Sequence, residues 1–340
     1  MVNWDHVEEG EIHCPRTKDQ ADAERLCGQL KIDFHVVNFV KEYWNRVFVD
    51  LLENYKRGRT VVSDVWCNKY IKFDLLHKFV FDELKVDAIA TGHFARTSFG
   101  DFLENWSEKE DVRLFRGADP LKDQTHFLSS LSQEQLRRVM FPIGSLYKPR
   151  VREIAKTAGF HIHDKAESMG ICFVGNRRDF DDFLAKYIDP TPGVLINIDT
   201  GKVVGEHMGV HNYTIGKRIG IGPQEGIRSN EGYFVAEIDW KTQTVYVCES
   251  SQHPCLFVTK FAITKPHWIC KSPKFDSNIA KIQFRHQRTV PPLKCQLKFD
   301  PEVSRFVLIP KNPIRATAPG QKMKKRKWTM ETQFSYYVLS

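Results

Sequence analysis

Apolar residues recur at helical spacing along the first part of the chain. Between Lys41 and Arg57 they follow one another at intervals of three and four residues, and Gly58 offers a natural stop. The same criteria predict a helix from Thr17 to about Leu30, where residues 17–20 fit a capping box, and another from Lys69 to Leu84.

Short apolar runs separate these helices. Residues 33–40 and 88–91 are predicted strands, and the alternation of helix and strand indicates a parallel sheet of the α/β type. The polar stretch 98–119 is predicted as a loop or hairpin insertion. Ser132 to Gln135 fits a second capping box, and Pro149 suits the first position of a helix that ends at Gly159.

The pattern changes after Pro190, beyond a last predicted amphipathic helix at 178–188. Short apolar runs alternate with turn residues and predict a mainly β half, a small linking domain followed by a barrel. The predicted strands are 233–238, 244–248, 280–286, 293–299 and 305–309. The predicted domains are 1–178, 179–245 and 246–340.

Composition narrows the class of protein. The 340 residues carry a formal net charge of +8, which permits nucleic-acid binding without proving it. No apolar run approaches the ~18–20 residues of a membrane span, so we expect no membrane contact, and residues 1–10 resemble neither a secretory signal nor a transit peptide. Eight cysteines without a C-x-x-C pair favour a reducing compartment, and we assign no metal ligands.

The basic run 322–327 is predicted to be a solvated, disordered end, with phosphate contact as the alternative.

Cys67 is the first candidate for chemistry. A cysteine just before a predicted helix lies near backbone N–H groups that favour its thiolate, and Lys69 and Lys72 add positive charge. Asp64, three residues earlier, could move a proton or orient a substrate. The alternative is a buried, inert cysteine.

Two further segments carry candidate residues. Cys172 lies between Gly170 and Gly175, which allow a close backbone approach, although a cysteine in a strand core is the simpler interpretation. Gly92 and His93 follow a predicted strand, and ligands bind at this end of an open α/β sheet. A turn glycine and a surface histidine are the alternative.

Taken together, these segments resemble the tRNA 2-thiouridylases. Residues 40–45 look most like the animal mitochondrial members, and the resemblance runs from Met1 to about Gln321. Eight motifs occur in the order of that family, at 64–73, 90–93, 122–128, 141–144, 167–173, 213–218, 284–287 and 318–321.

The resemblance implies a fold and a reaction. The fold is a PP-loop ATPase-like α/β domain, truncated at its start, with a β linking domain and a C-terminal β-barrel. ATP, with Mg²⁺, adenylates the C2 oxygen of the wobble uridine. A persulfide on Cys172, received from a sulfur-donor protein such as a cysteine desulfurase or relay, then attacks C2. Cys67 assists by releasing sulfide or by closing a disulfide with Cys172.

The resemblance also assigns site residues. Asp64 is the nearby acid/base or base-positioning group, and Gly92 and Met1 belong to the ATP site. Residues expected to face tRNA are spread along the chain: His93, Lys122, Asp123, Gln124, Arg285, His286 and Gln321. By themselves, the segments 122–125 and 285–287 would be taken as surface. The resemblance implies a mitochondrial location.

The sequence departs from that family at its beginning. No Ser-Gly-Gly loop for pyrophosphate occurs, and residues 61–63 replace a proline-rich lead into Asp64. We therefore expect a truncated isoform or an incomplete gene model rather than a specialised ATP-independent protein. The alternatives in function are a catalytically silent tRNA-binding protein and a redox switch between Cys67 and Cys172.

Overall fold

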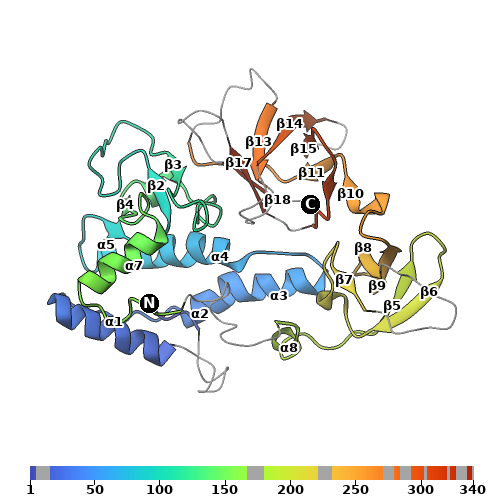
Figure 1. Cartoon of the computed structure of the whole chain (residues 1–340), viewed down its shortest axis with the longest axis horizontal. Helices are drawn as coiled ribbons and strands as arrows, with labels where there is room; N and C mark the ends of the chain where they lie inside the picture. Colours follow the sequence, from blue (N-terminus) through green and yellow to red (C-terminus); the bar gives the residue numbers. More distant parts are fainter. Residues whose placement is uncertain are drawn as a thin grey trace.

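The computed structural model places three groups of elements along the chain (Figure 1). It describes residues 1–4, 16–166, 180–220, 232–270, 279–283, 292–301, 305–319, 322–326 and 335–338. The α/β beginning and the two following β parts confirm the predicted fold class. Within the described ranges, no helix has the length and apolar character that crossing a membrane requires.

Helices dominate the first group. The predicted helix at 41–57 is confirmed as one continuous run that ends before Gly58, whose φ of +62° suits glycine. Gly159, at φ +72°, likewise follows the helix that Pro149 begins. The helices of this group are α1 (Arg16–Leu30), α2 (Val40–Tyr43), the π-helix η1 (Trp44–Phe48), α3 (Val49–Lys56), α4 (Ser63–Trp66), the π-helix η2 (Cys67–Leu75), α5 (Leu76–Asp82), α6 (Gln133–Leu136) and α7 (Lys148–Thr157).

Two predictions about helix starts were wrong. Thr17 lies inside α1 and is not its cap. The helix predicted to begin at Lys69 begins at Ser63, because Val65 and Ile71 are both fully buried on it and extend its packed face toward the N-terminus. The second capping box is confirmed, since Ser132 and Gln135 exchange side-chain to backbone hydrogen bonds at the start of α6.

The parallel sheet is short. Strand β1 (Ile89–Ala90) pairs in parallel with β4 (Val139–Met140), and an isolated parallel bridge joins Val2 to Asn38. The predicted strand at 33–40 is therefore reduced to that bridge. The hairpin predicted near 98–119 is confirmed by β2 (Ala95–Thr97) and β3 (Leu114–Arg116), which pair antiparallel.

An aromatic core joins the chain's beginning to later helices. Trp4 is 5% exposed and lies with its ring centroid 4.7 Å from that of Phe48. Phe183 of α8 (Phe180–Leu184) packs on the same cluster, 5.9 Å from Phe48. Figure 1 shows α8 beneath α3. Cys67 belongs to this core, so the helix with the candidate cysteine is anchored in it.

The second group is a five-stranded sheet in the order β6-β5-β9-β8-β7. The predicted hairpin at 233–248 is confirmed as the antiparallel pair β8–β9. Its elements are β5 (Gly193–Asn197), β6 (Val203–His207), the 3-10 helix η3 (Val210–Asn212), β7 (Arg218–Ile219), β8 (Tyr233–Asp239) and β9 (Thr244–Glu249).

The third group is a seven-stranded antiparallel sheet in the order β11-β15-β14-β13-β17-β18-β12. The basic run predicted to be a disordered end forms β17 over residues 322–326, because its backbone pairs with β13 and β18. Its strands are β11 (Phe261–Ile263), β12 (His267–Trp268), β13 (Ile279–Gln283), β14 (Leu293–Asp300), β15 (Arg305–Pro310), β17 (Lys322–Arg326) and β18 (Ser335–Val338). The group also contains the 3-10 helix η4 (Pro254–Leu256) and a separate antiparallel pair, β10 (Phe257–Val258) and β16 (Ile314–Arg315).

Candidate functional site

The helical run from Ser63 to Asp82 carries Asp64 and Cys67. Its middle, η2, is π-helical, and Phe73 within it departs from helical geometry at φ −106° and ψ 15°. Such π-helical turns inside longer helices are frequent at functional sites. Cys67 lies at the junction of α4 and η2, so the prediction that it precedes the helix was wrong.

Two hydrogen bonds fix this helix to neighbouring segments, a loop and helix α6. Asn68 donates from Nδ2 to the carbonyl of Phe127 at 3.2 Å, and Gln135 donates from Nε2 to the carbonyl of Lys69 at 2.9 Å. Cys67 itself is 4% exposed among apolar side chains. The helix therefore presents its polar residues from a firmly held position.

The pKa of Asp64 on this helix lies well above the ordinary value of an aspartate. Burial raises the pKa of its carboxyl to about 6, while the Lys72 ammonium acts in the opposite direction. A carboxyl with a pKa near neutrality can both accept and return a proton under physiological conditions. Asp64 is thus suited to the acid/base role expected of it.

His93 lies close to the same ammonium group. Burial first and then Lys72 lower the pKa of His93 to about 3, so its ring is neutral near pH 7. Its Nδ1 and the Thr91 hydroxyl are 2.8 Å apart, and its ring centroid is 5.8 Å from that of Phe73. Lys72 lowers the pKa of both Asp64 and His93, and we refer to these three residues as the Asp64–Lys72–His93 cluster. Sequence reasoning noted Lys72 only as a nearby charge, although it stands in the first-cysteine motif.

Gly92 lies two residues beyond the end of β1, past the carboxyl end of a parallel strand. A Cβ placed on it would meet no atom within 4 Å, so its backbone faces open space. Met1 is exposed and precedes Val2, whose backbone bonds to Val37 and Phe39 at 2.7 Å. Gly92 is thus accessible at the end of a parallel strand where ligands bind, and the nucleotide contacts of Gly92 and Met1 stay predictions.

The Phe141–Gly144 motif packs behind this edge. A Cβ on Gly144 would collide with the carbonyl oxygen of Ala95, two residues after His93. Glycine is therefore required here for the loop after β4 to reach the start of β2.

Hydrogen bonds connect the segment after Lys122 to residues of β3 and to the residue before β2. Asp123 is buried and accepts hydrogen bonds from Arg116 Nε at 2.8 Å and the Thr125 hydroxyl at 2.6 Å. Gln124 accepts from the Phe94 backbone N–H at 3.0 Å and returns a backbone bond to the Phe94 carbonyl. Asp123 and Gln124 thus hold the loop that carries Lys122, and their contact with tRNA stays a prediction.

The remaining predicted site residues lie outside the described ranges. These are Cys172, Arg285, His286 and Gln321. The structure brings Asp64 and Cys67 onto one helix and His93 beside it, while the pairing of Cys67 with Cys172 stays a prediction.

Each of the three groups of elements matches the model of a known protein family. Residues 1–176 match the model described as the tRNA methyl transferase HUP domain, 181–249 the tRNA methyl transferase PRC-barrel domain, and 258–323 the aminomethyltransferase beta-barrel domain. The HUP match agrees with the parallel strands and with nucleotide binding.

Named relatives match across nearly the whole chain. The probable mitochondrial tRNA-specific 2-thiouridylase 1 of Caenorhabditis elegans is 49% identical over 324 residues, covering 94% of this chain and 85% of the relative. The mitochondrial tRNA-specific 2-thiouridylase 1 of Homo sapiens is 40% identical over 342 residues, covering 94% and 79%. The tRNA-specific 2-thiouridylase MnmA of Levilactobacillus brevis is 39% identical over 321 residues, covering 94% and 82%. These matches do not support the silent tRNA-binding isoform, and the chain belongs to the tRNA-specific 2-thiouridylase family.

Proposed function

We propose that this chain is a mitochondrial tRNA-uridine 2-sulfurtransferase that places sulfur on C2 of the wobble uridine. The Asp64–Lys72–His93 cluster carries the proposal, because it puts a proton-transfer group and a cation on the helix of Cys67, at the open edge marked by Gly92. The family match and the named relatives support the reaction class and the mitochondrial location.

ATP is the co-substrate that this family uses, and when bound it makes the C2 oxygen of uridine a leaving group. Gly92 offers bare backbone for a close approach by phosphate, and Met1 lies at the start of the neighbouring strand segment. Lys72 supplies positive charge beside this edge, where Mg²⁺ would accompany the nucleotide.

Asp64 handles the proton of the base. Uridine loses its N3 proton when its C2 oxygen is activated, and a carboxylate with a pKa of about 6 can accept that proton near pH 7. Neutral His93 faces tRNA as a hydrogen-bonding group without adding charge.

Sulfur moves through the two cysteines. A donor protein leaves a persulfide on Cys172, and its outer sulfur forms a bond to C2 as the activated oxygen departs. The Cys67 thiolate then attacks the Cys172 sulfur, which breaks the S–S bond to the substrate sulfur and releases 2-thiouridine. The resulting Cys67–Cys172 disulfide is reduced by an external thiol before the next cycle.

Two single substitutions test these sulfur roles. Cys172→Ser should abolish the persulfide, whereas Cys67→Ser should retain it and block turnover; intact-protein mass spectrometry after sulfur loading distinguishes them. Cys27→Ser, on α1 and away from the cluster, is the matched control and should behave as wild type. A persulfide that persists on Cys172→Ser refutes the assignment.

A further inference from the structure

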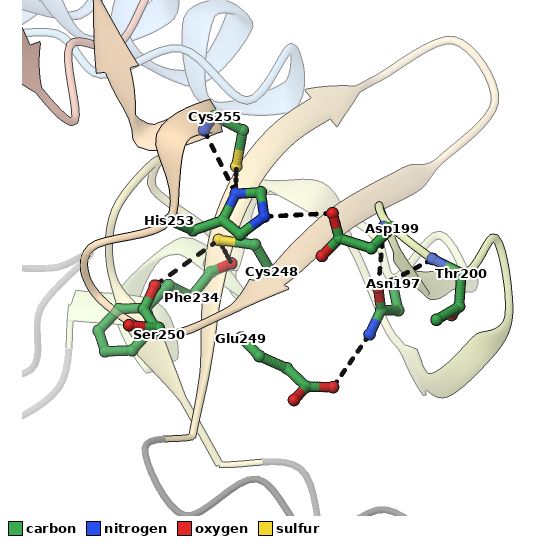
Figure 2. A network of polar contacts seen from close by, with 9 residues as sticks. All are labelled: Asn197, Asp199, Thr200, Phe234, Cys248, Glu249, Ser250, His253 and Cys255. Atoms are coloured by element: carbon green, nitrogen blue, oxygen red, sulfur yellow. Dashed lines mark hydrogen bonds and ion pairs between the residues drawn. The ribbon is translucent and has the colours of Figure 1, made fainter.

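A second group of chemically reactive side chains lies between the five-stranded sheet and the barrel. Cys248 is near the end of β9, and His253 and Cys255 follow at the start of η4. Their sulfur and ring-nitrogen atoms all lie within 4.8 Å of one another, which is the spacing of side chains that can share one metal ion. Figure 2 shows the three side chains converging.

The group opens to solvent on one side. Cys248 is fully buried, with its Sγ near the carbonyls of Phe234 at 3.7 Å and Ser250 at 4.0 Å. His253 is partly exposed, and Cys255 is exposed. A cation could therefore reach the group from solvent and settle against a buried sulfur.

The His253 ring is held in the orientation that a metal ligand needs. Its Nε2 lies 3.1 Å from a carboxylate oxygen of Asp199, which fixes the proton on Nε2. Its Nδ1 then keeps a lone pair and lies 2.8 Å from the Cys255 Sγ, with the Cys255 backbone N–H at 3.3 Å. A histidine that binds a metal through one nitrogen typically donates the other N–H to a carboxylate.

Asp199 is itself held in place. Buried Asn197 accepts from the backbone N–H groups of Asp199 at 2.9 Å and Thr200 at 3.3 Å, and it donates to Glu249 at 3.2 Å. Figure 2 shows this chain of contacts from Glu249 through Asn197 to the turn that carries Asp199. The support for His253 thus comes from a turn 54 positions away in sequence.

We propose that Cys248, His253 and Cys255 bind a thiophilic divalent cation of the zinc class, with a solvent molecule completing a four-coordinate site and Asp199 as a positioning residue. Two thiolates and one imidazole are ligands that Zn²⁺ prefers. Binding releases one proton from each thiol, and the two thiolate charges cancel that of the cation.

The position gives the site a structural consequence. The PRC-barrel match ends at residue 249 and the β-barrel match begins at 258, so Cys248 lies at the end of the first domain, and His253 and Cys255 lie in the connection between the two. A bound cation would tie the end of β9 to η4 and would fix the connecting chain before β10. The site would thereby restrict how the barrel moves relative to the rest of the protein.

Titration of the full chain with Co²⁺ and then Zn²⁺ tests the proposal. One Co²⁺ per chain should give d–d absorption of a tetrahedral site with thiolate charge transfer, and one equivalent of Zn²⁺ should remove both bands. Cys248→Ser and Cys255→Ser should each abolish this signal. Asp199→Asn should retain the spectrum but weaken affinity about 10–100-fold.

Two substitutions serve as matched controls. Cys27→Ser removes a thiol on α1, and Asp239→Asn removes a half-buried carboxylate of the same five-stranded sheet; both should leave the titration unchanged. Absence of the Co²⁺ bands in a folded chain, or their persistence in both cysteine variants, overturns the site. A Cys248–Cys255 disulfide that forms under mild oxidation in the presence of saturating Zn²⁺ would also overturn it, because coordinated thiolates are protected.

Discussion

The side-chain amide of Gln135 donates a 2.9 Å hydrogen bond to the backbone carbonyl of Lys69, one helix to another. Gln135 is also the reciprocal partner of Ser132 in the capping box of α6. One side chain therefore both starts a short helix and holds the π-helical turn that follows Cys67. The rigidity of the candidate site depends on a residue that touches neither substrate nor cysteine.

Replacing Gln135 with alanine should weaken both contacts. Loss of the cap and of a part-buried hydrogen bond should lower the free energy of unfolding by about 1–2 kcal/mol. Glu134→Ala, an exposed change on the same helix, should lower it by less than about 0.5 kcal/mol. Denaturant unfolding of the two variants measures the difference, and equal stability would show that the bond to Lys69 contributes nothing.

Asp64 predicts a pH dependence of stability. The folded protein holds the Asp64 proton up to a pH of about 6, whereas an aspartate in the unfolded chain releases it near its ordinary pKa of 3.8. The folded state therefore binds more protons in this window, and the free energy of unfolding falls as pH rises through it. Asp64→Asn should remove this fall and be more stable than wild type at pH 7 by about 1–3 kcal/mol.

The same group predicts a pH dependence of activity. The kcat/KM for thiolation should rise with pH through about 6, as Asp64 becomes able to accept a proton, and Asp64→Asn should lose both the inflection and most of the activity. Asp82→Asn, at the exposed end of the same helical run, should keep the wild-type profile. An unchanged inflection in Asp64→Asn would assign it to another group.

Replacing Gly92 should change KM for ATP without changing the melting temperature. A Cβ there meets no protein atom within 4 Å, so Gly92→Ala should leave the melting temperature near that of wild type. It should raise KM for ATP on the order of tenfold, because the new methyl group stands between backbone and nucleotide. Gly28→Ala on α1, where a Cβ is equally unhindered, is the control and should leave KM unchanged. An unchanged KM in Gly92→Ala would remove Gly92 from the nucleotide site.

Replacing Lys122 should change how strongly tRNA binding depends on salt concentration. If its ammonium meets one tRNA phosphate, Lys122→Ala should weaken binding and reduce the slope of log affinity against log salt by roughly 0.7–0.9. Lys18→Ala on α1 should not change the slope. Electrophoretic or fluorescence titrations at several salt concentrations measure it, and an unaltered slope for Lys122→Ala argues against that contact.

Local sequence signals predicted many elements because their causes are local. Gly58, Gly159 and the Ser132 capping box each define a helix end through their own backbone or side-chain geometry. The start of the Cys67 helix was misplaced because burial of Val65 and Ile71, a tertiary effect, extends it to Ser63. The basic run 322–326 likewise joins a sheet through pairing with β13, some forty residues earlier, which local charge does not reveal.

The candidate site was predictable in part for the same reason. Asp64 and Cys67 stand three residues apart in a recognisable motif, whereas the influence of Lys72 on His93 arises only when the fold brings the helix next to His93, whose ring centroid lies 5.8 Å from that of Phe73. The cluster at Cys248 was missed because its C-x4-H-x-C spacing is unfamiliar and its supporting Asp199 lies far away in sequence. The contact between Asp199 and His253 forms only in the folded protein.

Thiolation by the purified chain is the most direct measure of the proposed function. The protein is incubated with mitochondrial tRNA, ATP, a reducing thiol, and a cysteine desulfurase with cysteine as the persulfide donor. The tRNA is then digested, and 2-thiouridine is quantified by mass spectrometry, with Cys67→Ser and Cys172→Ser in parallel. We predict ATP-dependent 2-thiouridine at the wobble position with wild type and none with either variant. Binding of tRNA without any 2-thiouridine from the wild-type chain would contradict the proposed function.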